Sequence, residues 1–236
     1  MRPGASNRWR DLGRRAISAL VLAPIALAGV WLGGLTFSLL IGAGMVLLVI
    51  EWARLCRRAG APWGLAGGTP WLLAGGTLWM LLAAVALLWL RADPATGRAN
   101  LLFLMLLIWA SDIGAYLVGR LVGGPLLAPR ISPGKTWSGA AGGLVAALAV
   151  GWAAASLLPA ATEPARVAEV ALVLCVIGQL GDLAESWAKR HFGVKDSGTL
   201  IPGHGGLLDR LDALIAVAPF AALLALFLGH GVLLWE

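Results

Sequence analysis

Long apolar stretches separated by short polar ones make up most of this 236-residue chain. An α-helix needs about 20 consecutive apolar residues to cross the hydrocarbon core of a bilayer. Seven stretches approach this length, at 16–33, 35–51, 69–90, 100–122, 138–158, 167–186 and 207–229. The third could form two short passes or one tilted span. The pattern predicts an all-α, polytopic integral membrane protein with about seven transmembrane helices, and the 59% share of hydrophobic residues argues against a soluble domain.

The basic residues are divided unequally between the two ends of these predicted spans. With the N-terminus inside, 15 of the 18 lysines and arginines fall on the cytoplasmic side, and only Arg91, Arg98 and Arg166 fall outside. Such a bias is typical of the cytoplasmic loops of membrane proteins. It predicts a cytoplasmic N-terminus, and it explains the net charge of +6 without any binding of nucleic acid.

The polar residues also suggest how the chain is organised. Residues 1–15 form a basic cytoplasmic arm, and residues 16–236 form a single transmembrane catalytic domain. Within it, we expect residues 16–100 to be a scaffold without buried charge, where Glu51 stands at the edge of a span. Residues 101–236 carry the candidate chemistry in their spans and cytoplasmic loops.

A cluster of acidic and basic residues lies at the end of the sixth predicted span. Asp182, Glu185 and Lys189 are spaced i, i+3 and i+7, which puts them on one face of a helix. An ion pair that only holds helices together would have the same spacing. Because ionisable residues inside a membrane usually mark functional sites, we expect a metal-binding carboxylate that faces a polar cavity.

A second acidic group opens the last predicted span, where Asp209, Arg210 and Asp212 follow one another closely. Acidic residues in a first helical turn also interact favourably with the helix dipole, so simple capping is an alternative. Asp182 and Asp209, from two different helices, could share a Mg²⁺ ion, which prefers oxygen ligands and substrate phosphates.

A glycine-rich segment joins these two groups. It contains Lys195-Asp196 and Pro202-Gly203-His204-Gly205-Gly206. Glycines allow backbone N–H groups to approach a phosphate, and a lysine adds a positive charge. His204 could contact a phosphate or transfer a proton, or it could only hold the loop by hydrogen bonding.

Further upstream, Asp112 lies deep in the fourth predicted span, where it must face protein or water. Pro133-Gly134 then predicts a turn, after which Lys135 and Thr136 begin a helix. A helix N-terminus beside a lysine can bind an anion. The spacing differs from that of a P-loop, and a plain cytoplasmic turn with an interfacial lysine remains an alternative.

The spacing of these residues resembles the phosphatidate cytidylyltransferase (CDP-diacylglycerol synthase) family. The resemblance covers roughly residues 111–139 and 178–212, and its signature comprises Ser186, Lys189-Arg190, Lys195-Asp196, Pro202-Gly203-His204-Gly205-Gly206 and Asp209-Arg210-Leu211-Asp212. Ala188, Ser138 and Gly124-Pro125 depart from the family pattern without touching the carboxylates or His204.

The resemblance implies transfer of the cytidylyl group of CTP to phosphatidate, with release of pyrophosphate. It implies Mg²⁺ and a K⁺ ion at the site, and a location in the bacterial inner membrane with the active site on the cytoplasmic side. The resemblance does not decide whether the protein forms a homodimer. The rival functions are a CTP-dependent transferase for another lipid phosphate and an ion-coupled transporter, although transporters tend to bind at the bilayer midplane.

The resemblance also assigns roles to individual residues. Asp182 and Asp209 are the expected metal ligands, with Asp212 and Asp112 in support. The expected catalytic residues are Asp182, Lys189, Lys195, His204, Asp209 and Arg210. The expected substrate-binding residues are Lys135, Thr136, Ser186, Arg190, Asp196, Gly205 and Gly206.

Overall fold

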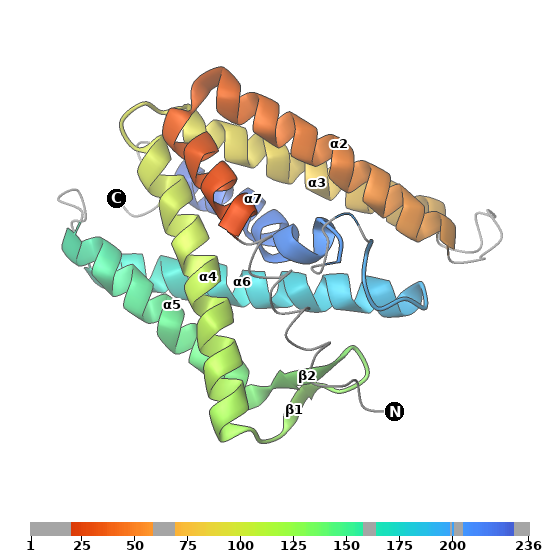
Figure 1. Ribbon diagram of the computed structural model, residues 1–236. Helices are drawn as coiled ribbons and strands as arrows, with labels where there is room; N and C mark the ends of the chain where they lie inside the picture. The colour runs from red at the N-terminus through yellow and green to blue at the C-terminus, as the bar shows by residue number, and fades with distance from the viewer. Residues whose placement is uncertain (1–19, 59–68, 158–163, 199, 201–204, 229–236) are drawn as a thin grey trace.

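The computed structural model describes residues 20–58, 69–157, 164–198, 200 and 205–228 (Figure 1). A helix over Leu20–Leu32 comes first. The elements that follow are α2 (Gly34–Arg58), α3 (Thr69–Ala92), α4 (Gly97–Val122), β1 (Leu126–Ala128), β2 (Ser132–Thr136), α5 (Trp137–Leu157), α6 (Pro164–His191) and α7 (Leu208–Leu228).

The predicted membrane architecture is confirmed. The helices α2 to α7 are each long and apolar enough to cross a bilayer, and Leu20–Leu32 is a shorter apolar helix. The first predicted span begins outside the described residues, at residue 16. The third predicted span is one continuous helix, α3, rather than two short passes. Large apolar side chains also cover the outer surface, among them Leu39, Val85 and Leu121, as expected where a helix faces lipid.

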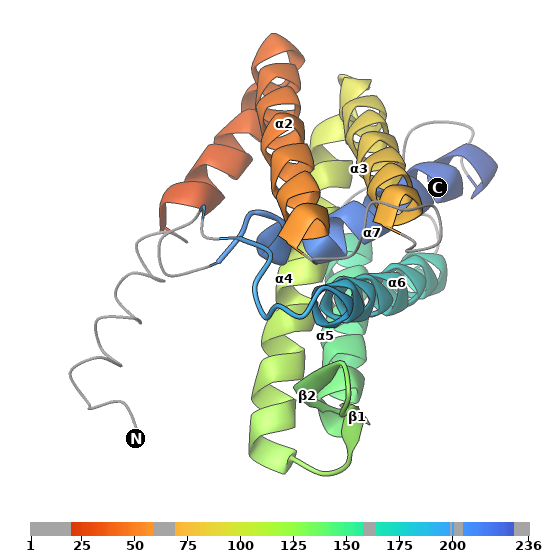
Figure 2. The ribbon, with the colours of Figure 1, turned by 90° about the vertical axis from the view of Figure 1, so that its right-hand side faces the viewer.

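The helices pack in a defined order. The helix α4 packs on α5, α5 on α6, α6 on α7, α7 on α3, and α3 on α2. Figure 2 shows the α2–α3 pair in the upper part of the protein, with α4 and α5 running side by side below it. Glycines allow α4 and α5 to approach closely, since a Cβ atom added to Gly142 would lie 2.8 Å from the carbonyl oxygen of Gly114. Small residues serve the same purpose in many membrane helix pairs.

A short hairpin replaces the turn that we expected at Pro133-Gly134, which lie within strand β2, and the helix start that we expected at Lys135 and Thr136. Both residues end strand β2, which pairs antiparallel with β1 in the register Leu126↔Thr136 and Ala128↔Ser132. The strand persists to this point because the pairing holds it, and Thr136 then caps the following helix. The backbone N–H of Gly139 donates to Thr136 Oγ1 at 3.0 Å, a standard N-cap contact.

Two charged residues of the expected scaffold are buried, so the prediction of no buried charge there was wrong. Glu51 is 5% exposed and Arg91 is 9% exposed. Arg91 Nε donates to the carbonyl oxygen of Val30 at 2.7 Å, near the end of the helix Leu20–Leu32. Carbonyl groups at a helix C-terminus lack partners within the helix, which explains why a buried arginine is tolerated there.

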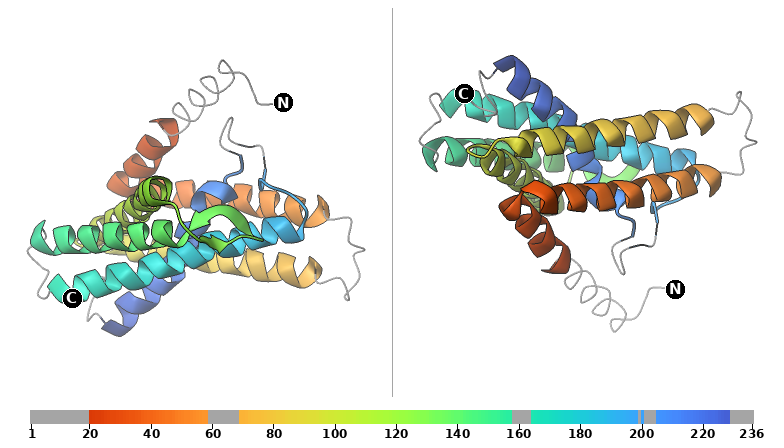
Figure 3. Two further views of the ribbon diagram at one scale, coloured as in Figure 1. Left: turned by 90° about the horizontal axis from the view of Figure 1, so that it is seen from below. Right: turned by 90° about the horizontal axis from the view of Figure 1, so that it is seen from above.

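The helices alternate in direction and bring several ends to one side of the protein. The C-terminal ends of α2 and α6 and the N-terminal end of α3 lie together in both views of Figure 3. The hairpin β1–β2 follows the C-terminal end of α4, and α7 begins after the loop that leaves α6. This side therefore collects the polar segments in which the sequence placed its candidate residues.

Candidate active site

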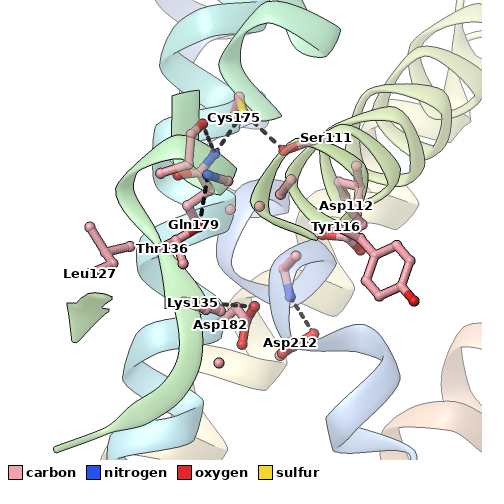
Figure 4. Close-up of a pocket in the computed structure, with 18 of the residues that line it drawn as sticks. Ser111, Asp112, Tyr116, Leu127, Lys135, Thr136, Cys175, Gln179, Asp182 and Asp212 are labelled. Atoms are coloured by element: carbon pink, nitrogen blue, oxygen red, sulfur yellow. Dashed lines mark hydrogen bonds and ion pairs between the residues drawn. The ribbon is translucent and has the colours of Figure 1, made fainter. Parts of the chain in front are cut away.

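A cavity of about 760 Å³ opens between α4, β2, α6 and α7. Its volume falls within the range of about 300–1,000 Å³ that is typical of small-molecule sites. Figure 4 shows Asp112 and Tyr116 on the α4 side, opposite Lys135 and Asp182. The charged residues that line the cavity are Asp112, Arg120, Lys135, Asp182, Lys189, Asp196, Asp209, Arg210 and Asp212.

Three carboxyl groups converge in this region. Asp182 and Glu185 of α6 and Asp212 of α7 each offer an oxygen atom, and these atoms lie within 4.8 Å of one another. Asp182 and Glu185 reach the same point because they are one helical turn apart, as the sequence predicted. Asp209 is not a member of this group, although we expected it to share an ion with Asp182.

The donor set suits a divalent cation. Both carboxyl oxygens of Glu185 are buried; Oε2 pairs with Lys189, whereas Oε1 has no hydrogen-bond partner among the described residues. Buried polar atoms are usually satisfied, so such an atom points to a missing partner. Carboxyl oxygens from two helices are the ligands that Mg²⁺ prefers. Asp182, Glu185 and Asp212 therefore fit a metal centre.

Asp209 belongs to a neighbouring network of buried charge. Lys189 Nζ lies 2.7 Å from Asp209 Oδ1 and 2.5 Å from Glu185 Oε2. The side chains of these residues are between 6% and 14% exposed. The backbone N–H groups of Ser197 and Gly206 donate to Asp209 Oδ2 at 3.0 and 2.8 Å. Asp209 therefore holds the glycine-rich loop beside the cavity, and Lys189 links that loop to the acidic group.

The hairpin contributes the second lysine of the site. Lys135 on β2 forms an ion pair with Asp182 on α6, across 47 residues of sequence. In Figure 4 this pair lies between the hairpin and Asp212. A positive charge therefore already stands beside the acidic group, on an element that also lines the cavity.

Other predicted residues lie at the edges of the site. Asp112 lines the cavity from α4, and Arg210 and Asp196 line it from α7 and the loop. Arg190 is exposed and donates to the main-chain carbonyls of Ile131 and Val194, at 3.2 and 3.3 Å. It therefore ties the end of α6 to the hairpin.

The remaining predicted residues differ in how exposed they are and in whether the structure describes them. Lys195 is exposed, and Ser186 is half-buried on α6. Gly205 has a φ of +84° and leaves no room for a side chain, since a Cβ atom would lie 2.7 Å from Asp209 Oδ2. His204, with Pro202 and Gly203, lies outside the described residues.

Two further acidic residues lie beside the predicted ones, although neither was assigned a role of its own from the sequence. Glu185 joins the acidic group, and its position one turn after Asp182 was a signal for it. Glu51 reaches the glycine-rich loop from α2, where its Oε2 atom accepts a hydrogen bond from the backbone N–H of Leu208 at 2.8 Å. Only its acidic character at the end of an apolar helix could have pointed to it.

Comparison with known proteins connects this geometry to a family. The sequence profile described as "Cytidylyltransferase family" matches residues 70–228. A protein named phosphatidate cytidylyltransferase from Brucella suis biovar 1 is 47% identical over 193 residues, which cover 82% of this chain. Proteins of the same name from Haemophilus influenzae and Staphylococcus aureus are 46% and 45% identical, each over 54% of this chain.

The lengths of these proteins differ from that of this chain. The matched part covers 65% of the Brucella protein, and 46% and 49% of the other two. The profile match runs from α3 through α7, so it includes every element that lines the cavity. It covers more than half of the sequence, and on this basis the chain belongs to the cytidylyltransferase family.

Proposed function

We propose that this chain transfers the cytidylyl group of CTP to phosphatidate, which gives CDP-diacylglycerol and pyrophosphate for phospholipid biosynthesis. One observation carries the proposal: Asp182 and Asp212, two of three convergent carboxyl groups, line a cavity among membrane helices together with the lysine and arginine side chains that phosphates require. Membership of the cytidylyltransferase family and the names of its relatives support the same reaction.

The reaction needs little covalent work from the protein. A phosphate oxygen of phosphatidate attacks the α-phosphorus of CTP, and the bond from that phosphorus to the β-phosphate bridging oxygen breaks, so pyrophosphate leaves with the electron pair. Phosphate is already a competent nucleophile, so positioning and neutralisation of charge supply the catalysis. Lys135, Arg120 and Arg210 line the cavity and are the groups that we assign to the phosphates.

Asp182, Glu185 and Asp212 would hold Mg²⁺ in this proposal. A bound Mg²⁺ ion neutralises triphosphate charge and polarises the reacting phosphorus. Lys135 then has two partners over the reaction cycle, because it pairs with Asp182 in the structure and can turn to a substrate phosphate. Several points stay predictions from the sequence. They are the catalytic roles of Lys195 and His204, the presence of a K⁺ ion and the formation of a homodimer.

The site is proposed to face the cytoplasm of a bacterial cell, from the inner membrane. Arg54, Arg57 and Arg130 lie on the side of the protein that carries the site, whereas Arg98 and Arg166 lie near the opposite ends of the spans. This distribution supports a cytoplasmic site by the positive-inside bias. In this orientation CTP enters the site from the cytosol. Phosphatidate enters the same site, in residues 101–236, from the bilayer.

The proposal is tested with purified protein in mixed micelles. With CTP, phosphatidate and Mg²⁺, we expect equal amounts of CDP-diacylglycerol and pyrophosphate, and at least a hundredfold loss of turnover in excess EDTA that added Mg²⁺ reverses. Diacylglycerol and other lipid phosphates serve as control acceptors. Turnover of a control acceptor in place of phosphatidate would contradict the proposed substrate, and unchanged turnover in EDTA would contradict the metal.

A further inference from the structure

Glu51 lies at the junction between the N-terminal helices and the glycine-rich loop. It is 5% exposed, and it comes from α2, outside the segment that matches the family profile. Its Oε2 atom accepts a hydrogen bond from the N–H of Leu208, the first residue of α7. A helix N-terminus has N–H groups without partners, so Glu51 caps α7 from a distant part of the chain.

The second oxygen of Glu51 faces the loop. Glycines at 198 and 206 leave room for it, since a Cβ atom on Gly198 would collide with Glu51 and one on Gly206 would collide with both Glu51 Oε1 and Ser197 Oγ. These two oxygens are buried without a hydrogen-bond partner among the described residues. Ser197 is only 2% exposed. Gly198 and Gly206 therefore pack closely against the Glu51 side chain.

Ser197 and Gly206 connect Glu51 to Asp209. Ser197 Oγ and Glu51 Oε1 both lie close to the Cα atom of Gly206, where a Cβ atom would meet them. The backbone N–H groups of Ser197 and Gly206 donate to Asp209 Oδ2. The Glu51 side chain thus supports one side of this pair, and Asp209 binds the other. A shift of Glu51 would move both donors, and with them the Asp209–Lys189 ion pair.

The end of α2 is well anchored for this purpose. Trp52 follows Glu51 and donates from Nε1 to the carbonyl oxygens of Leu72 and Leu73 on α3, at 3.2 Å each. Its ring also packs edge-on against Phe192, which begins the loop, with centroids 5.9 Å apart. Residues on rigid elements position a site more accurately than residues on loops alone.

We propose that Glu51 is a positioning residue for the site. It fixes the start of α7 and the Ser197–Gly206 pair, so that Asp209 and Lys189 are held in place before substrate binds. The proposal rests on the proposed function only for its effect on turnover, because the positioning itself can be measured without substrate.

The first test measures hydrogen exchange in detergent micelles without ligand. In Glu51→Ala, we expect the amides of Ser197, Gly206 and Leu208 to exchange about tenfold faster, while amides in the middle of α6 keep their wild-type rates. Glu169→Ala, which removes an exposed acid from α6, is the matched control and should change none of them. Unchanged exchange of the loop amides in Glu51→Ala would overturn the proposal.

The second test separates positioning from general loss of folded protein. Glu51→Ala should lower kcat about a hundredfold, in line with a small misplacement of catalytic groups. Glu51→Gln should stay within about threefold of wild type, because its amide oxygen still accepts from the N–H of Leu208 and its side chain keeps the size and shape of glutamate. Equal losses in the glutamine and alanine variants would contradict the assignment.

A third variant tests the packing. Gly198→Ala should accelerate loop exchange as Glu51→Ala does, because its methyl group displaces the Glu51 side chain. In the double variant the methyl group enters the space that Glu51 leaves, so exchange should be no faster than in Glu51→Ala alone. Additive effects would overturn the proposal. If wild-type protein failed to transfer cytidylyl groups but these exchange results held, the proposed function would fail and the positioning role would stand.

Discussion

Asp182→Asn should reduce kcat/KM for cytidylyl transfer at least a thousandfold, which corresponds to about 4 kcal/mol of transition-state stabilisation. The substitution removes one carboxyl group from the set of three that we assign to the cation. It also leaves Lys135 without its ion-pair partner, but both side chains are about a third exposed, so the cost in stability should be small. The measurement is turnover of CTP with phosphatidate over a range of Mg²⁺ concentrations.

A matched variant on the same helix controls for this experiment. Glu169→Gln neutralises an exposed acid of α6 that does not line the cavity, and it should keep wild-type turnover. Gel filtration and circular dichroism should show that both variants are folded and of the same size as wild type. Turnover of Asp182→Asn within threefold of wild type at every Mg²⁺ concentration would remove Asp182 from the metal centre.

Lys189→Met should destabilise the protein by about 3–5 kcal/mol, because it leaves two buried carboxyl groups without their shared counter-charge. Glu185 and Asp209 both contact the ammonium group, and their side chains are 7% and 6% exposed. Methionine approximates the volume of the lysine chain, so the loss reports charge rather than a cavity. Unfolding in detergent, followed by circular dichroism, measures the change.

A double variant distinguishes stability from activity in this network. Lys189→Met combined with Asp209→Asn removes one of the two stranded charges, so we expect part of the lost stability to return. Turnover should not return, because the double variant restores neither the positive charge at position 189 nor the carboxylate that holds the loop. If the free energy of unfolding of Lys189→Met lay within about 1 kcal/mol of the wild-type value, this ion-pair network would contribute little to stability, which would contradict the prediction.

Most helices of this protein could be predicted from sequence alone, because their apolar stretches are long enough to cross a bilayer, and only the division of residues 69–90 into one span or two was left open. Local spacing was equally informative within α6, where Asp182, Glu185 and Lys189 share a face as their i, i+3 and i+7 positions require. Both features depend on residues that are close in sequence. The hairpin was missed because strand pairing between Leu126 and Thr136 is not encoded in the Pro133-Gly134 turn signal.

Contacts between segments that are distant in the sequence could not be predicted from it. Asp182 and Asp209 were expected to share an ion, whereas the carboxyl oxygens that lie within 4.8 Å of one another in the structure are those of Asp182, Glu185 and Asp212. The packing of α6 on α7, which brings these oxygens together, is not encoded in the local spacing. Lys135 meets Asp182 only because the hairpin folds back over α6. Glu51 is separated from Leu208 by 157 residues, and no local pattern links them.

The central claim is that Asp182, Glu185 and Asp212 bind the divalent cation, whereas Asp209 organises the loop beside it. The most direct test is electron paramagnetic resonance of Mn²⁺ titrated into purified protein without substrate, since Mn²⁺ takes the same oxygen ligands as Mg²⁺. We predict one saturable Mn²⁺ site in wild type that is weakened at least tenfold in Asp182→Asn and in Asp212→Asn but is retained in Asp209→Asn. Mn²⁺ binding that survives in Asp182→Asn and Asp212→Asn, or that disappears only in Asp209→Asn, would contradict the account.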